Sequence, residues 1–200
     1  MKRARDILAT MTTGRWLRSR WLGVLPLIFF IVQFIHYWRF GGLGNMLWMC
    51  NVGNLLLAIG LFLDHRELIR AAAIWTIPGL LVWFRYVLWD YGFLFSSTLA
   101  HVGGIIVGMI ALQRVGMDRT AWFYAFVWSL FMQMAARLLT SPDLNVNLAH
   151  QIQPGWEKYF SSYWQFWLVL TIVTALVLWG LGRLVSIWWR PPAPISAEQS

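Results

Sequence analysis

The chain has 200 residues, of which 59% belong to the apolar set and only 12% are charged. Soluble domains contain about 45–50% apolar and about 25% charged residues, so this composition excludes an ordinary water-soluble globular protein. The net charge of +8 does not indicate a nucleic-acid-binding protein, because six of the 16 basic residues lie in the first 20 positions and no basic face recurs afterwards. The single Cys excludes an internal disulfide.

Six apolar runs are long enough to cross the hydrocarbon core of a bilayer, which takes about 20 helical residues. They cover residues 21–38, 43–63, 68–89, 93–112, 121–139 and 160–188. The first run has no small-residue cleavage pattern near its end, which favours a retained helix over a signal peptide. Many of the 15 Trp residues lie near the ends of these runs, as in interfacial aromatic belts. The sequence therefore predicts an all-α polytopic membrane protein with six transmembrane helices.

The basic residues predict the orientation, because Lys and Arg are retained on the cytoplasmic side of a membrane. With the N-terminus inside, 12 of the 16 basic residues lie on that side and both termini are cytoplasmic. We expect a basic cytoplasmic segment over 1–20, a transmembrane domain over 21–189 and a disordered, Pro-containing cytoplasmic tail over 190–200. The predicted location is the bacterial inner membrane.

Polar side chains concentrate in the outer half of the predicted spans. Cys50 and Asn51 fall roughly 10–12 Å below the outer end of the second span, and Asn54 lies one turn deeper. His101 falls about 12 Å below the outer end of the fourth span, so a thiol and an imidazole share one depth. The inner half is mostly aliphatic. Because ionisable groups inside a membrane normally face a protein interior or a wet cavity, the pattern predicts a polar pocket open to the outer leaflet.

A Cys and a His at one depth form the pair that nucleophilic catalysis needs, because the imidazole can take the proton of the attacking thiol. Each residue also has a structural interpretation: Cys50 as a small packing residue, and His101 as a hydrogen-bonding residue between helices that Gly103 and Gly104 bring close. Ser97, one turn before His101, could orient the imidazole or act as another nucleophile.

A metal site would have to combine Cys50, His36 and His101 with Asp90 or His150, and no metal-binding spacing such as CxxC or HxxxH supports it. The sequence indicates neither a metal nor another cofactor. An ion path or a transporter is disfavoured, because the inner half has almost no ionisable residues and no inverted repeat is evident.

Several polar residues are candidates for contact with a phospholipid. Arg85 and Arg137 are expected to hold the phosphate, although each could simply extend to the interface. Asn51 or Asn54 could stabilise an oxyanion. Asn147, in the long loop before the last span, could meet a phosphate or glycerol group, its alternative role being to cap a turn.

Three short motifs occur in order: LWMCN at 47–51, STLAHVGGII at 97–106 and NVN at 145–147. In order and spacing they resemble the YwaF-like integral membrane family, which is related to eukaryotic transmembrane acyltransferases of ether-phospholipid remodelling. The resemblance covers roughly 41–185. It implies that Cys50 is a nucleophile with His101 as its partner, that Asn147 matches the family's loop Asn, and that a fatty acyl chain moves between lipids through a thioester.

The sequence thus predicts a lipid acyltransferase-like protein whose partners are the phospholipids of the surrounding bilayer. The alternative is a non-catalytic membrane scaffold or lipid-binding protein, in which the same polar residues only satisfy buried groups and position a partner.

Overall fold

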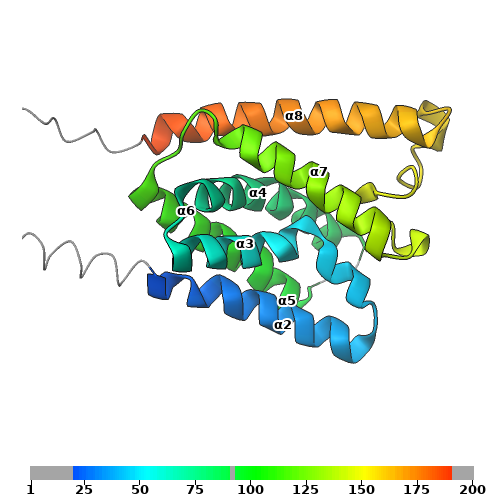
Figure 1. Ribbon diagram of the computed structural model, residues 1–200. Coiled ribbons are helices and arrows are strands. Elements are labelled where there is room, and N and C mark those ends of the chain that lie inside the picture. The colour runs from blue at the N-terminus through cyan, green and yellow to red at the C-terminus, as the bar shows by residue number, and fades with distance from the viewer. Residues whose placement is uncertain (1–19, 91–92, 191–200) are drawn as a thin grey trace, which may run out of the picture.

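The structure is a computed structural model that describes residues 20–90 and 93–190 (Figure 1). Every element in these ranges is helical: α2 (Val24–Phe40), η1 (Leu43–Leu47), α3 (Met49–Leu63), α4 (Arg66–Arg85), η2 (Tyr86–Asp90), α5 (Phe95–Thr98), η3 (Leu99–Gly103), α6 (Gly104–Val115), α7 (Ala121–Leu139), η4 (Pro142–Leu144), η5 (Val146–Leu148), η6 (Glu157–Tyr159) and α8 (Tyr163–Trp188). The expected basic segment over 1–20 and tail over 190–200 lie outside the described residues, apart from Arg20 and Arg190.

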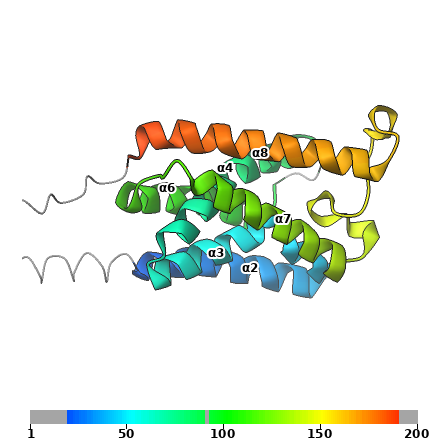
Figure 2. The same cartoon turned by 45° about the horizontal axis from the view of Figure 1, so that its top comes forward.

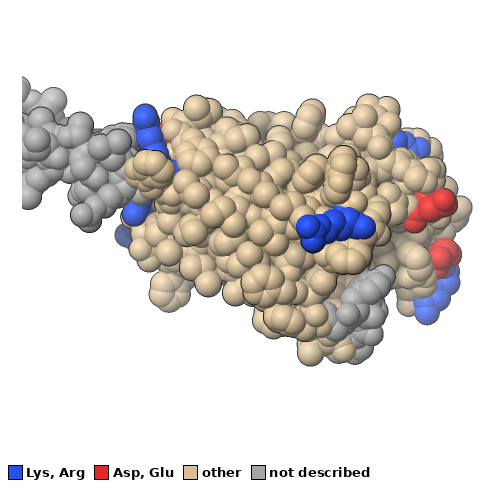
Figure 3. All heavy atoms as spheres, turned by 90° about the horizontal axis from the view of Figure 1, so that it is seen from below, with Lys and Arg blue, Asp and Glu red and all other residues tan. Residues whose placement is uncertain are grey.

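Within the described ranges, four helices are long and apolar enough to cross a membrane: Arg20–Phe40, Arg66–Leu88, Phe95–Val115 and Tyr163–Trp188. Their outward faces carry large apolar side chains in contact with the surroundings, among them Leu81, Ile106 and Leu176. In the face that Figure 3 shows, most Lys, Arg, Asp and Glu side chains gather at the two ends of the molecule. A broad apolar surface between charged ends is the surface of a membrane protein.

Helix α4 lies at the centre of the bundle. It packs against α3, α6 and α7, whereas α2 packs on α3 and α8 packs on α7 (Figures 1 and 2). Ala71, Ala72 and Ala73 on α4 are almost completely buried. Such small side chains let neighbouring backbones approach closely, which is how helices associate in a membrane that offers no hydrophobic driving force between them.

The bundle is closed at the end where α2 begins and α8 ends. Arg70, with 6% of its surface exposed, donates from Nε to the Gly116 carbonyl at 2.9 Å and from Nη2 to the Val115 carbonyl at 3.0 Å. Its Nη1 pairs with Glu67 at 2.7 Å. The last carbonyls of a helix have no partner within that helix, so Arg70 supplies the donors that the end of α6 lacks.

Three of the predicted spans break or change helix type along their length. In the span expected over 68–89, α4 ends at Arg85 and the π-helical η2 follows. The span expected over 43–63 consists of η1 and the 15-residue α3, separated by Trp48, whose backbone is extended (φ −56°, ψ 132°). The span expected over 93–112 contains the π-helical turn η3, which includes His101. Cys50 therefore lies in the first turn of a helix rather than in the middle of one, and His101 lies on a backbone bulge of a kind that is frequent at functional sites.

Candidate functional site

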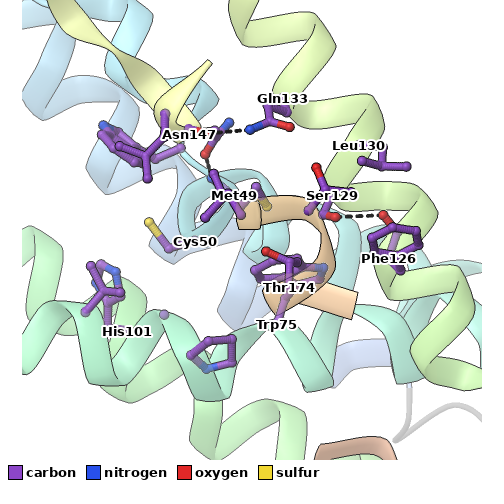
Figure 4. A pocket seen from close by; sticks show the side chains of 17 residues that line it. Met49, Cys50, Trp75, His101, Phe126, Ser129, Leu130, Gln133, Asn147 and Thr174 are labelled. Carbon is purple, nitrogen blue, oxygen red and sulfur yellow. Dashed lines mark hydrogen bonds between the residues drawn. The ribbon is translucent and has the colours of Figure 1, made fainter. Parts of the chain in front are cut away.

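A cavity of about 250 Å³ lies among α3, α4, η3, α7, η5 and α8 (Figure 4). Apolar side chains make up most of its wall, and the polar side chains on it are Cys50, His101, Ser129, Gln133, Asn147, Thr171 and Thr174. Val82 of α4 lies on the wall and is half exposed, so the cavity opens towards the lipid-facing surface. An apolar hollow with a few polar groups is the usual form of a small-molecule or lipid site.

Cys50 and His101 lie on the wall of this one cavity, at the same end of it (Figure 4). Gly79 of α4 separates them: a Cβ on Gly79 would lie 3.6 Å from the Cys50 Cβ and 3.7 Å from the His101 Cδ2. Because glycine has no side chain, the space between the Cys50 Cβ and the imidazole edge stays open. Pro78 precedes Gly79 inside α4 and removes one backbone donor there, a second irregularity beside the cavity.

The imidazole of His101 is held in one orientation. Its Nδ1 lies 2.7 Å from the Ser97 carbonyl oxygen, with the Ser97 hydroxyl at 3.4 Å. A carbonyl can only accept, so in the neutral ring Nδ1 carries the hydrogen and Nε2 keeps its lone pair. The ring also stacks on Trp83 at 6.3 Å between centroids. The Cδ2 edge, next to Nε2, faces Gly79. This is the tautomer that a general base requires.

Asn54 joins the backbones that carry the two residues. Its Nδ2 donates to the Cys50 carbonyl at 2.9 Å and to the Ala100 carbonyl at 3.0 Å, so α3 is tied to the turn that contains His101. The side chain is 1% exposed, and Oδ1 has no hydrogen-bond partner in the described part of the chain. A Cβ on Gly104 would approach Oδ1 to 2.7 Å, so glycine is needed there. Since both amide hydrogens are engaged, Asn54 does not offer a donor to the cavity.

Asn147 holds the start of α3 from the loop. Its Oδ1 accepts from the Met49 N–H at 3.0 Å, and its Nδ2 donates to the Leu47 carbonyl at 2.7 Å. The first N–H groups of a helix lack acceptors within the helix, and Asn147 supplies an acceptor for the N–H of the residue before Cys50. Its own backbone is left-handed (φ 53°), a conformation that Asn tolerates better than most residues. The residue reaches the cavity wall, yet its amide is used on the protein itself.

The other predicted lipid-contacting residues lie off the cavity wall. Asn51 is buried and donates from Nδ2 to the Asn45 carbonyl at 2.9 Å. Arg85, at the end of α4, is exposed. Arg137 donates to the Ala149 carbonyl, and its guanidinium lies 4.9 Å and 5.1 Å from the ring centroids of Tyr163 and Trp164. Asn51 nevertheless meets the thiol, because the Cys50 Sγ donates to the Asn51 Oδ1 at 4.0 Å. The structure brings Cys50, His101 and Asn147 to the wall of the cavity and leaves Arg85 and Arg137 away from it.

Sequence reasoning missed Gly79 and the hydroxyls of Ser129 and Thr171 as parts of the site. Ser129 donates to the Phe126 carbonyl at 2.7 Å and Thr171 to the Trp167 carbonyl at 2.8 Å, so each hydroxyl oxygen is left to act only as an acceptor. A Pro-Gly pair inside an apolar run was the one available signal, since it marks a disturbed helix. Hydroxyls in apolar helices give no such signal, because they satisfy themselves on their own helix.

In the described residues, no three His, Cys, Asp or Glu side chains come close enough to share a metal ion. Cys50 and His101 could supply two ligands at most to such an ion. Comparison with known proteins gives no assignment: no family model matches the chain, and neither a curated protein nor a solved structure is significantly similar to it.

Proposed function

We propose that this membrane protein is an acyltransferase-like enzyme in which Cys50 is the nucleophile, His101 is the base and phospholipids of the bilayer are the substrates. The observation that carries the proposal is that Cys50 and His101 both lie beside Gly79, on the wall of one cavity that opens to the lipid. The Ser97 carbonyl supports it, because it leaves Nε2 of His101 free to accept a proton. The resemblance of the Cys50, His101 and Asn147 motifs to the YwaF-like family suggests the same chemistry.

In the proposed reaction, Nε2 of His101 takes the thiol proton and the Cys50 sulfur attacks the ester carbonyl of a phospholipid. The carbon–oxygen bond of the ester breaks, the lysolipid oxygen takes the proton from His101, and the acyl chain remains on Cys50 as a thioester. The hydroxyl of a second lipid then attacks the thioester with His101 as its base, which restores the thiol. The apolar wall formed by residues such as Phe126 and Leu170 accommodates the acyl chain.

Asn54 and Asn147 contribute by position in this proposal. Their amides hold the Cys50 carbonyl, the Ala100 carbonyl and the start of α3. Asn51, which bonds to the Asn45 carbonyl, supports the same turn. Such backbone contacts hold the reacting groups within the narrow geometry that catalysis needs.

We place the enzyme in the bacterial inner membrane with six spans and both termini in the cytoplasm. The described Arg residues support this orientation, because seven of them lie at the end of the bundle where α2 begins: Arg20, Arg66, Arg70, Arg114, Arg119, Arg183 and Arg190. The cavity lies towards the other end, beside the loop that contains Asn147. In the proposed orientation that end is in the outer leaflet. Arg85 and Arg137, exposed at that end, would meet lipid phosphates.

The test is acyl transfer by purified protein in vesicles that contain a phospholipid with a labelled acyl chain and an acceptor lysolipid. We expect an acyl adduct on Cys50 by mass spectrometry, no adduct in Cys50→Ala, and a large loss of transfer in His101→Phe, which keeps the ring that stacks on Trp83. His36→Phe is the matched control, because the His36 ring contacts the Phe40 ring away from the cavity. Full transfer by Cys50→Ala would refute the proposal.

A second candidate is a non-catalytic scaffold or lipid-binding protein. It is favoured by one observation: Asn54, Asn147 and Arg137 all bind backbone carbonyls, as purely structural polar residues do. Labelling with a lipid-like electrophile separates the two functions. Rapid modification of Cys50 that slows in His101→Phe indicates an activated thiol, whereas equally slow labelling of both proteins indicates the scaffold.

A further inference from the structure

A second hollow, of about 10 Å³, adjoins the large cavity behind the pair of reactive side chains. Cys50 and His101 line both spaces, so they form part of the wall between them. Gly53, Thr76 and Ala100 line the small hollow but not the cavity. Gly53 is buried, yet a Cβ built on it would meet no heavy atom within 4 Å. An unfilled space therefore lies beside Gly53, lined by residues of α3, α4 and η3.

The size and the polar groups of this hollow fit a water molecule. A water needs roughly 10–15 Å³ and two to four polar partners, whereas an acyl chain or a lipid headgroup is far larger. Thr76 donates its hydroxyl hydrogen to the Ala73 carbonyl at 2.7 Å, so its oxygen is left to accept. His101 donates from Nδ1 to Ser97, so Nε2 accepts as well. Thr76, His101 and Cys50 all line the hollow, so a water there would have two acceptors and the Cys50 side chain among its neighbours.

We propose that this hollow binds the water that hydrolyses an acyl chain from Cys50, so that the protein releases free fatty acid. The inference rests on the proposed function, which supplies the thioester. Nε2 of His101 takes one proton from the water, and the water oxygen attacks the thioester carbonyl. The carbon–sulfur bond then breaks, the Cys50 sulfur takes the proton back from His101, and a carboxylic acid leaves.

The position of the hollow makes this water independent of the lipid acceptor. Gly53 and Ala100 are buried, so the hollow faces the core of the bundle, whereas the large cavity opens at Val82 towards lipid. The two nucleophiles, water and lipid hydroxyl, would thus approach the thioester from different sides. Filling the hollow removes one of them without obstructing the other.

The test follows the acyl chain in vesicles of phosphatidylcholine with a labelled acyl group, prepared in ¹⁸O-enriched water. Gly53→Ala places a methyl in the hollow, and Thr76→Val removes one acceptor at nearly constant volume. Gly180→Ala is the matched control, because Gly180 of α8 is also a helical glycine with no atom within 4 Å of an added Cβ, away from the hollow. Thermal unfolding of each variant verifies that it folds.

The wild type is expected to release fatty acid that carries ¹⁸O. Both Gly53→Ala and Thr76→Val should slow this release by about tenfold or more and accumulate acyl-Cys50, because a misplaced nucleophile costs that much in rate. Gly180→Ala should match the wild type. If acyl-Cys50 forms but is hydrolysed as fast in Gly53→Ala and in Thr76→Val as in the wild type, the water site is wrong and the proposed function stands. If the wild type never acylates Cys50, both are wrong.

Discussion

Replacing Asn54 with Ala tests how the site is held together. The change deletes the hydrogen bonds from Nδ2 to the Cys50 and Ala100 carbonyls. A net hydrogen bond contributes about 0.5–1.5 kcal/mol in proteins generally, and interhelical ones in a membrane average about 0.6 kcal/mol. The Ala100 carbonyl keeps the Gly104 N–H as a partner, which limits the penalty. We therefore expect the free energy of unfolding to fall by about 1–2 kcal/mol.

The assay is unfolding of purified protein in mixed micelles at increasing mole fraction of denaturing detergent, followed by Trp fluorescence. Gln113→Ala is the control, because Gln113 is an exposed side chain of α6 that lies outside the cavity. The labelling of Cys50 by a lipid-like electrophile should slow in Asn54→Ala, since α3 and the His101 turn are no longer tied together. An unfolding midpoint equal to that of the wild type would show that the two bonds contribute nothing net and that another contact holds α3 against the turn.

Two further predictions concern other parts of the bundle. Gly104→Ala should unfold at a lower detergent fraction than Gly180→Ala. A Cβ at position 104 would approach the Asn54 Oδ1 to 2.7 Å, whereas a Cβ at position 180 meets nothing within 4 Å. Equal unfolding midpoints would contradict the packing described. Hydrogen bonds from the hydroxyl and backbone N–H of Thr120 hold the pKa of Asp118 below its usual range. The stability that Asp118 contributes is therefore present above the unfolded-state pKa of about 3.9 and is lost as pH falls through the lower folded-state pKa. The unfolding temperature of Asp118→Asn should therefore lie below that of the wild type at neutral pH and equal it in strong acid. A difference in unfolding temperature that persists in acid would argue against this cause.

The membrane class and the helical architecture could be predicted from the sequence because they depend on composition and on the length of apolar runs. A bilayer leaves no other partner for backbone polar groups, so an apolar run of that length has to form a helix. The four long apolar helices confirm this part, while six spans and the orientation stay predictions. The break at Trp48 and the π turn at His101 could not be predicted, since neither Pro nor a charged residue lies at either place.

The candidate site divides in the same way. Residue type and depth alone singled out Cys50 and His101, because a thiol or an imidazole inside an apolar run is unusual wherever the helices pack. Which polar residues face the cavity and which bind the backbone depends on how the helices rotate about their axes. Only the tertiary structure could decide that Asn54 is used between α3 and η3, that Arg137 lies against Tyr163, and that Gly79 lies beside both Cys50 and His101. The physical reason is that helix rotation is fixed by close packing of small residues, which the pattern of hydropathy does not record.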